Sequence, residues 1–177
     1  MLIKNLGFNE DNINFDNISD EKINFLSDSI EVNLGNRRVL IKNLGIAHTK
    51  GDLIAYDFNT KTYITGDVIF IGRAAAFSDA NIPMWINVIN NKLDLSWDYL
   101  IPGHGSIIKN KLELNDTKNW LYFLDDAVKK AVSEGDMISE IFQYPIPKEI
   151  QHLKMKSITL RQGIKKQLNL YRKKYIE

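Results

Sequence analysis

Three short glycine-flanked segments carry the side chains best suited to chemistry, two histidines and an aspartate. They read AHTKGD, TGDVIF and IPGHG, and their candidate metal ligands are His48, Asp67 and His104. Imidazole nitrogen and carboxylate oxygen are suitable ligands for zinc. The neighbouring glycines leave no Cβ to crowd a metal ion or a substrate. The three segments, in this order, therefore indicate a metal site built on short strands.

Each segment taken singly has a simpler interpretation. A histidine in a loop, such as His48, is more often a hydrogen-bonded structural residue than a ligand. An aspartate that follows glycine at a strand end, as Asp67 does, commonly caps a turn. Gly103-His104-Gly105 could also be only a turn. The ordered set of three, rather than any one segment, favours a functional site.

The elements that must position these segments are short strands in the first half of the chain. Alternating apolar and polar residues predict a strand over 30–34, and Gly35-Asn36 is a two-residue hairpin signal. The other predicted strands cover 37–44, 53–56, 62–65 and 99–101. Asp67 and His104 then follow strand ends directly, and His48 lies in a loop after the return strand.

The second half of the chain is predicted to be helical. Pro83 suits the first turn of a helix over 85–93, and an amphipathic stripe over 116–134 ends at Gly135. Further helices fit 137–142 and 158–175. Strands followed by helices indicate an α/β layered domain over 30–177. Residues 1–29 form a separate polar segment, for which we expect irregular structure or a short helix.

Composition excludes several classes of protein. Of the 177 residues, 44% are hydrophobic and 25% are charged, which is typical of one globular domain. The formal net charge of +1 gives no strong field that would attract nucleic acid. Because cysteine is absent, disulfides, thiolate metal sites and cysteine nucleophiles are ruled out. The sequence shows neither a leader peptide nor an apolar run of about 18 residues, so no membrane association is predicted.

The three motifs together resemble the last three metal-ligand motifs of the metallo-β-lactamase superfamily. The likeness runs from about residue 30 to the C-terminus and is closest to the quinoprotein relay system zinc metallohydrolases. It is carried by GIAHTKGDLIAYDFNTKTYITGDVIFIGR, by FSDANIPMWINVINNKLDL and by the helical C-terminal extension. The resemblance implies the C-terminal half of an αββα sandwich, with a mixed or antiparallel sheet and flanking helices.

The resemblance also implies a two-zinc hydrolase that acts on a small-molecule substrate. His48 would complete the first zinc site, Asp67 would bridge the metals or ligate the second, and His104 would ligate the second. A metal-bound hydroxide would attack an ester, thioester, lactam or similar bond, because zinc lowers the pKa of its water to about 7. Arg73, in the loop that follows, would hold an anionic substrate group or pair with Asp79 as a loop clamp.

One departure from the family pattern weakens the prediction of a two-zinc hydrolase. The signature His-x-His-x-Asp-His is absent, and the only histidines are His48, His104 and His152. A catalytic zinc normally has three protein ligands and a water, whereas here the first metal would keep one family ligand and the second two. We therefore expect a truncated or split enzyme that needs a separate N-terminal half, on which any leader for a periplasmic location would lie. The alternative is a degenerate, non-catalytic binding module of the same fold.

Two features near the C-terminus have ordinary explanations. No glycine or sheet edge frames His152, so a surface or capping role is expected. Residues 154–177 hold eight lysines and arginines against one acid. Because few aromatic residues are interleaved with them, a solvated helix face is favoured over binding to nucleic acid or a membrane surface.

Overall fold

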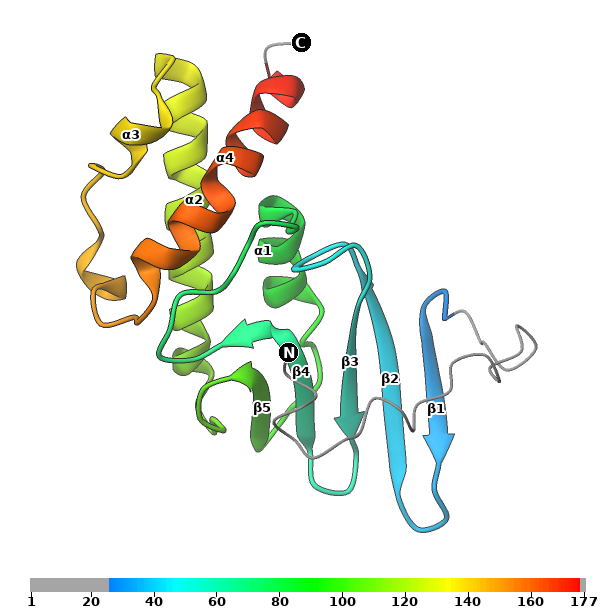
Figure 1. Cartoon of the computed structure of the whole chain (residues 1–177). Coiled ribbons are helices and arrows are strands. Elements are labelled where there is room, and N and C mark those ends of the chain that lie inside the picture. Colours follow the sequence, from blue (N-terminus) through cyan, green and yellow to red (C-terminus); the bar gives the residue numbers. More distant parts are fainter. Residues whose placement is uncertain (1–25, 176–177) are drawn as a thin grey trace, which may run out of the picture.

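The computed structural model describes residues 26–175, and its centre is a mixed sheet of five strands (Figure 1). The strands are β1 (Ser29–Asn33), β2 (Arg38–Gly45), β3 (Asp52–Asp57), β4 (Thr62–Phe70) and β5 (Tyr99–His104). They lie side by side in chain order. Strands β1 to β4 pair antiparallel with one another, and β5 pairs parallel with β4. The predicted α/β fold with a mixed sheet is confirmed.

Helices supply the second layer. They are α1 (Ile82–Asn91), α2 (Asn115–Glu134), α3 (Ile138–Ile141) and α4 (Lys156–Tyr175), with 3-10 turns η5 (Lys111–Leu114) and η6 (Lys148–Ile150). The side chain of Asn81 caps α1 by accepting a hydrogen bond from the backbone N–H of Met84 at 3.1 Å. Gly135, with φ of 76°, ends α2 in the left-handed conformation. Because α2 packs against both α1 and α4, it is the central helix of this layer.

The two faces of the sheet differ in what covers them. On one face, strand pairing places Tyr56, Tyr63 and Leu100 in one row, and all three are buried. On the other face, a row of apolar side chains crosses all five strands, and we call this row the open sheet face: Ile30, Ile41, Ala55, Ile64 and Ile101. Ile30 is 50% exposed and Ile64 is 47% exposed, so the open sheet face is not covered as a core would be.

Strand β4 differs from its prediction. It continues past Thr65 to Phe70, so Asp67 lies within the strand rather than after it. The reason is Gly66, whose φ of 51° lets the strand shift its register against β5 and then resume pairing at Phe70. Strand β5 likewise reaches His104.

Two expectations are affected by the extent of the described chain. The polar segment 1–29 falls almost wholly outside the described residues, so its separation from the domain stays a prediction. Within residues 26–175, no helix is both long and apolar enough to cross a membrane.

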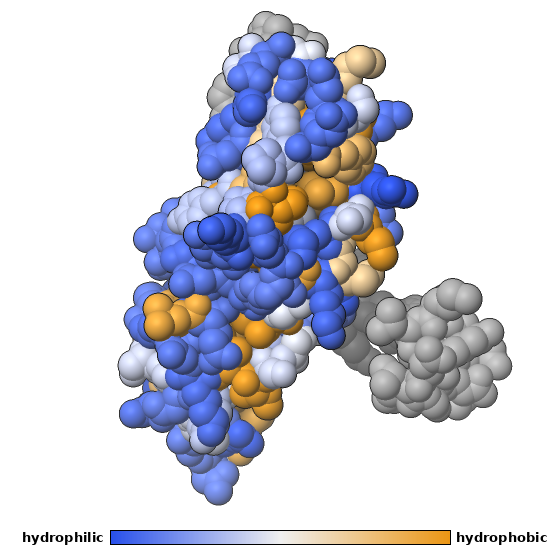
Figure 2. Space-filling view, turned by 90° about the vertical axis from the view of Figure 1, so that its left-hand side faces the viewer, coloured by the Kyte–Doolittle hydropathy of each residue, from blue (hydrophilic) through white to orange (hydrophobic). Residues whose placement is uncertain are grey.

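Figure 2, which views the molecule from the left-hand side of Figure 1, shows apolar patches broken up by hydrophilic residues.

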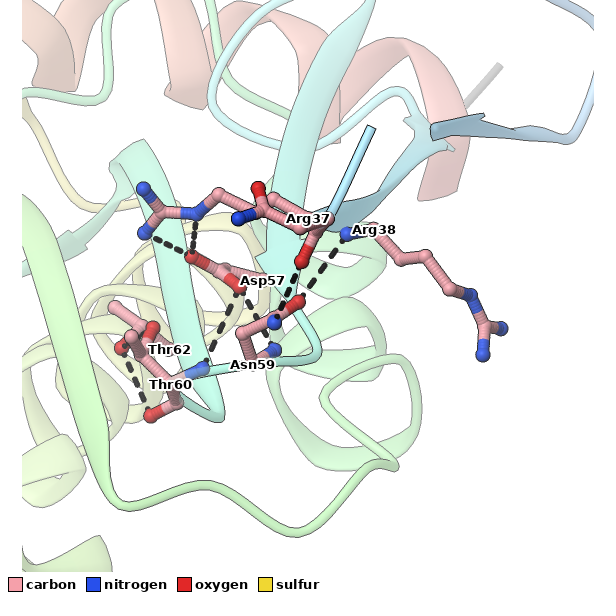
Figure 3. A network of polar contacts seen from close by, with 7 residues as sticks. Arg37, Arg38, Asp57, Asn59, Thr60 and Thr62 are labelled. Carbon is pink, nitrogen blue, oxygen red and sulfur yellow. Dashed lines mark hydrogen bonds and ion pairs between the residues drawn. The ribbon is translucent and has the colours of Figure 1, made fainter. Parts of the chain in front are cut away.

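A polar network ties the β3–β4 turn to the β1–β2 hairpin (Figure 3). Asp57 accepts hydrogen bonds from Nε of Arg37 at 2.6 Å and from the backbone N–H of Asn59 at 2.8 Å. Oδ1 of Asn59 in turn accepts from the backbone N–H of Arg38 at 3.2 Å. The hydrogen bond from Arg37 is the main cause that holds the pKa of Asp57 below its ordinary value of 3.8.

The substitution Asp57→Asn is expected to destabilise the fold at neutral pH and to do so less as the pH falls. Because the pKa of Asp57 is lower in the folded chain, its ion pair contributes stability above the unfolded pKa and loses it as the pH drops through the folded pKa. Urea unfolding of both proteins between pH 7 and pH 3 measures the difference. Arg37→Gln should give the same trend, and a pH-independent difference would contradict the argument.

Candidate metal centre

Asp67 and His104 meet where β4 and β5 run side by side. Nε2 of His104 lies 3.6 Å from Oδ1 of Asp67, and the two side chains are 43% and 44% exposed. This separation is longer than an ordinary hydrogen bond. It is close to the roughly 3.4 Å that separates two tetrahedral ligands, each about 2.0–2.1 Å from one zinc ion. The pair therefore has the spacing of two ligands of a shared metal.

The glycines beside His104 are needed for this approach. A Cβ on Gly103 would lie 2.1 Å from Oδ1 of Asp67 and 2.6 Å from the backbone carbon of Gly66. A Cβ on Gly105 would lie 2.3 Å from the carbonyl oxygen of Ile71, and its φ is 103°. The backbone N–H of Ile71 donates to the carbonyl of His104 at 2.9 Å. The Gly-His-Gly sequence thus places His104 by letting two strands and a loop pack closely.

His48 lies in the loop between β2 and β3, and Asp52 orders that loop. The Asp52 carboxylate accepts hydrogen bonds from the backbone N–H of Thr49 at 2.9 Å and from its hydroxyl at 2.8 Å. The His48 ring contacts Trp85, with centroids 5.0 Å apart. Its Nδ1 is buried and has no hydrogen-bond partner. A buried nitrogen without a partner costs free energy, and binding to a metal ion or to a hydrogen-bond donor would offset that cost.

Phe70 contacts both histidines. Its ring stacks on His104 with centroids 5.0 Å apart, and it lies 5.7 Å from the ring of His48. The Thr117 hydroxyl accepts from the Phe70 backbone N–H at 2.9 Å and donates to the Phe70 carbonyl at 2.7 Å. Phe70 ends the TGDVIF motif, but its contacts with both histidines and its hydrogen bonds with Thr117 were not predicted. Thr117 is far from the motif in the chain, and no local signal marks it.

The structure brings together two of the three predicted ligands. Asp67 and His104 converge, whereas the ring of His48 contacts Phe70, which in turn stacks on His104. Among residues 26–175, no three histidine, aspartate or glutamate side chains are grouped so that they could hold one metal ion. A shared ion fits the Asp67–His104 pair, but a catalytic zinc with three protein ligands would need a donor from outside this group.

The other candidates have different surroundings. Nε of Arg73 is buried without a partner. The predicted ion pair between Arg73 and Asp79 is wrong, because the carboxylate of Asp79 pairs with Lys166 on α4 instead. Nε2 of His152 is 2.9 Å from Oδ1 of Asp116, whose other oxygen accepts from the backbone N–H of Gly72 at 2.7 Å. His152 therefore interacts with the first turn of α2.

Comparison with solved structures identifies the fold. The sec-alkyl sulfatase PisA1 matches with a TM-score of 0.64 and 15% identity, over 85% of this chain and 26% of that one. A metallo-β-lactamase from Pontibacter korlensis matches with a TM-score of 0.49 and 17% identity, over 55% of this chain and 47% of that one. The DIM-1 metallo-β-lactamase matches with a TM-score of 0.46 and 20% identity, over 54% of this chain and 44% of that one. At such identities the likeness concerns the fold alone.

This chain's mixed sheet with flanking helices matches part of the sulfatase structure at the level of the fold. No family model matches the sequence, and no curated protein matches it. The chain spans about half the length of the metallo-β-lactamases that it matches.

Proposed function

We propose that this chain is the C-terminal part of a zinc-dependent hydrolase of the metallo-β-lactamase superfamily, related to the quinoprotein relay system metallohydrolases. The observation that carries the proposal is the 3.6 Å separation between His104 and Asp67, which suits two ligands of one metal ion. The reaction is hydrolysis of an ester, thioester, lactam or similar bond in a small molecule. The remaining ligands come from the N-terminal half of the fold.

Each candidate residue has a distinct role in this proposal. Asp67 and His104 hold the second metal, and His48 belongs to the first. When bound, zinc supplies an acidified water and a Lewis acid. Phe70 keeps the two imidazoles in place by contacting both rings. Arg73 binds an anionic group of the substrate, which its unpartnered Nε supports.

The open sheet face supports the need for a second half. A row of apolar side chains across five strands stays partly exposed, although burying it would be favourable. A second sheet packed on this row would bury it, as in a two-sheet sandwich. The same packing could bring further ligands to the edge where Asp67 and His104 lie.

Zinc binding by the chain alone tests the proposal. We expect less than stoichiometric zinc and no detectable hydrolysis of lactams or thioesters, because two converging ligands hold zinc weakly. Equilibrium dialysis followed by elemental analysis gives the zinc content. Asp67→Ala and His104→Ala should abolish the residual binding, whereas His152→Ala should leave it unchanged. Tight binding of two zinc ions by the lone chain would require ligands other than these.

A second candidate is a non-catalytic binding module of the same fold. It is favoured by the absence of any three-ligand group among residues 26–175. The two functions differ in one outcome. A binding module stays inactive when an N-terminal half is supplied, whereas a split enzyme gains both zinc and turnover.

A further inference from the structure

A groove of about 670 Å³ lies between α4 and the chain from α3 onward, and none of the proposed metal ligands lines it. A volume of this size is in the range of small-molecule sites. The apolar part of the groove comes from both sides: Ile138, Phe142 and Ile146 on one, and Leu160 and Ile164 on the other.

The apolar residues that line the groove differ in how deeply they are buried. Leu160 and Ile164 are only 5% and 1% exposed, so they form the floor. Phe142 is 43% exposed and forms part of the wall. An apolar ligand that entered the groove would therefore cover partly exposed surface without disturbing the core beneath it.

The charged residues that line the groove are all basic. Arg161 and Lys165 line it from successive turns of α4, and no acidic residue is among its lining residues. Neither side chain has a hydrogen bond or ion pair with another residue in the described part of the chain. Like charges spaced i,i+4 on a helix repel each other. A bound anion would relieve this repulsion.

Other cations of the same segment are engaged elsewhere. Lys166 pairs with Asp79, and Arg172 donates to the carbonyl of Asp136 at 3.0 Å. Lys156 also lines the groove, but its ammonium group donates to the carbonyl of Gln151 at 2.6 Å. The basic C-terminal segment is therefore not a uniform solvated face. Two of its basic residues that form no ion pair in the described part of the chain, Arg161 and Lys165, line an apolar groove.

We propose that this groove binds a free single-chain amphiphile with an anionic head, of the fatty-acid class. The alkyl chain lies on Leu160 and Ile164 against Phe142, and the carboxylate binds Arg161 and Lys165. A guanidinium can bind a carboxylate through two parallel hydrogen bonds, which gives the head group a defined place. The absence of acidic lining residues disfavours a cationic amphiphile.

Titration of the full chain with dodecanoate, kept below the concentration at which it forms micelles, tests the proposal. We expect saturable binding that the double variant Arg161→Gln/Lys165→Gln weakens on the order of tenfold or more. Lys173→Gln, an exposed change on the same helix away from the groove, is the matched control and should leave the affinity unchanged. Thermal unfolding of each variant checks that the fold is retained.

Three outcomes would overturn the proposal. The first is the absence of saturable binding. The second is binding that the double variant does not weaken, which would place the ligand on another apolar surface such as the open sheet face. The third is binding to vesicles of anionic phospholipid but not to dodecanoate, which would indicate a membrane surface instead. The test does not depend on zinc, so it is independent of the proposed hydrolase.

Discussion

An N-terminal fragment that carries His-x-His-x-Asp-His, taken from a full-length relative, is expected to give this chain both bound zinc and hydrolytic turnover. The fragment supplies the imidazoles that are missing around Asp67 and His104, and three protein ligands are what a catalytic zinc requires. Without a fixed metal, no acidified water forms near neutral pH, so turnover should rise from undetectable to measurable. His104→Ala should abolish it again.

The open sheet face provides the control for this experiment. Ile64→Lys places a charge in the middle of the face and should block complementation, because a charge buried between two sheets is costly. Leu112→Lys changes a residue that is 70% exposed on η5 and is not part of the open sheet face, and it should have no effect. If Ile64→Lys complements as well as the unmodified chain, the second half does not dock on this face.

Local patterns were sufficient to predict most elements of the fold. Apolar-polar alternation predicted β1, and the glycine at residue 35 predicted its turn. The amphipathic stripe and Gly135 predicted both ends of α2 to within one residue. These features depend on residues close together in the chain. The closeness of Asp67 and His104 was expected from the resemblance to a known family rather than from local patterns, because the two residues lie on different strands.

The rest of the site depends on contacts between distant parts of the chain. The ring of His48 packs against Phe70 and Trp85, and this packing leaves no periodic signal in the sequence. Asp79 finds its partner in Lys166, which is 87 residues away, rather than in the nearby Arg73. The extension of β4 likewise depended on how Gly66 pairs with another strand, which the segment alone does not reveal.

Gly103→Ala is expected to destabilise the chain by about 2–3 kcal/mol and to separate His104 from Asp67. The added Cβ would lie 2.1 Å from the Asp67 carboxylate, which could rotate away. It would also lie 2.6 Å from the backbone carbon of Gly66 and 2.7 Å from the backbone nitrogen of Asp67, and these atoms cannot rotate away. Strands β4 and β5 would have to move apart at the point where they present the proposed ligands.

Gly51→Ala is the matched control for Gly103→Ala, because a Cβ at Gly51 meets nothing within 4 Å. Its effect on stability should stay within about 0.5 kcal/mol, as for most surface substitutions. Urea unfolding of the two variants compares their stabilities, and zinc content in the complemented protein reports the ligand geometry. Gly103→Ala should lower both quantities, whereas Gly51→Ala should leave the stability nearly unchanged. If Gly103→Ala matched the stability of the unmodified chain, then β5 would not need glycine to approach β4. The close approach of the two strands would then not be what places His104 beside Asp67.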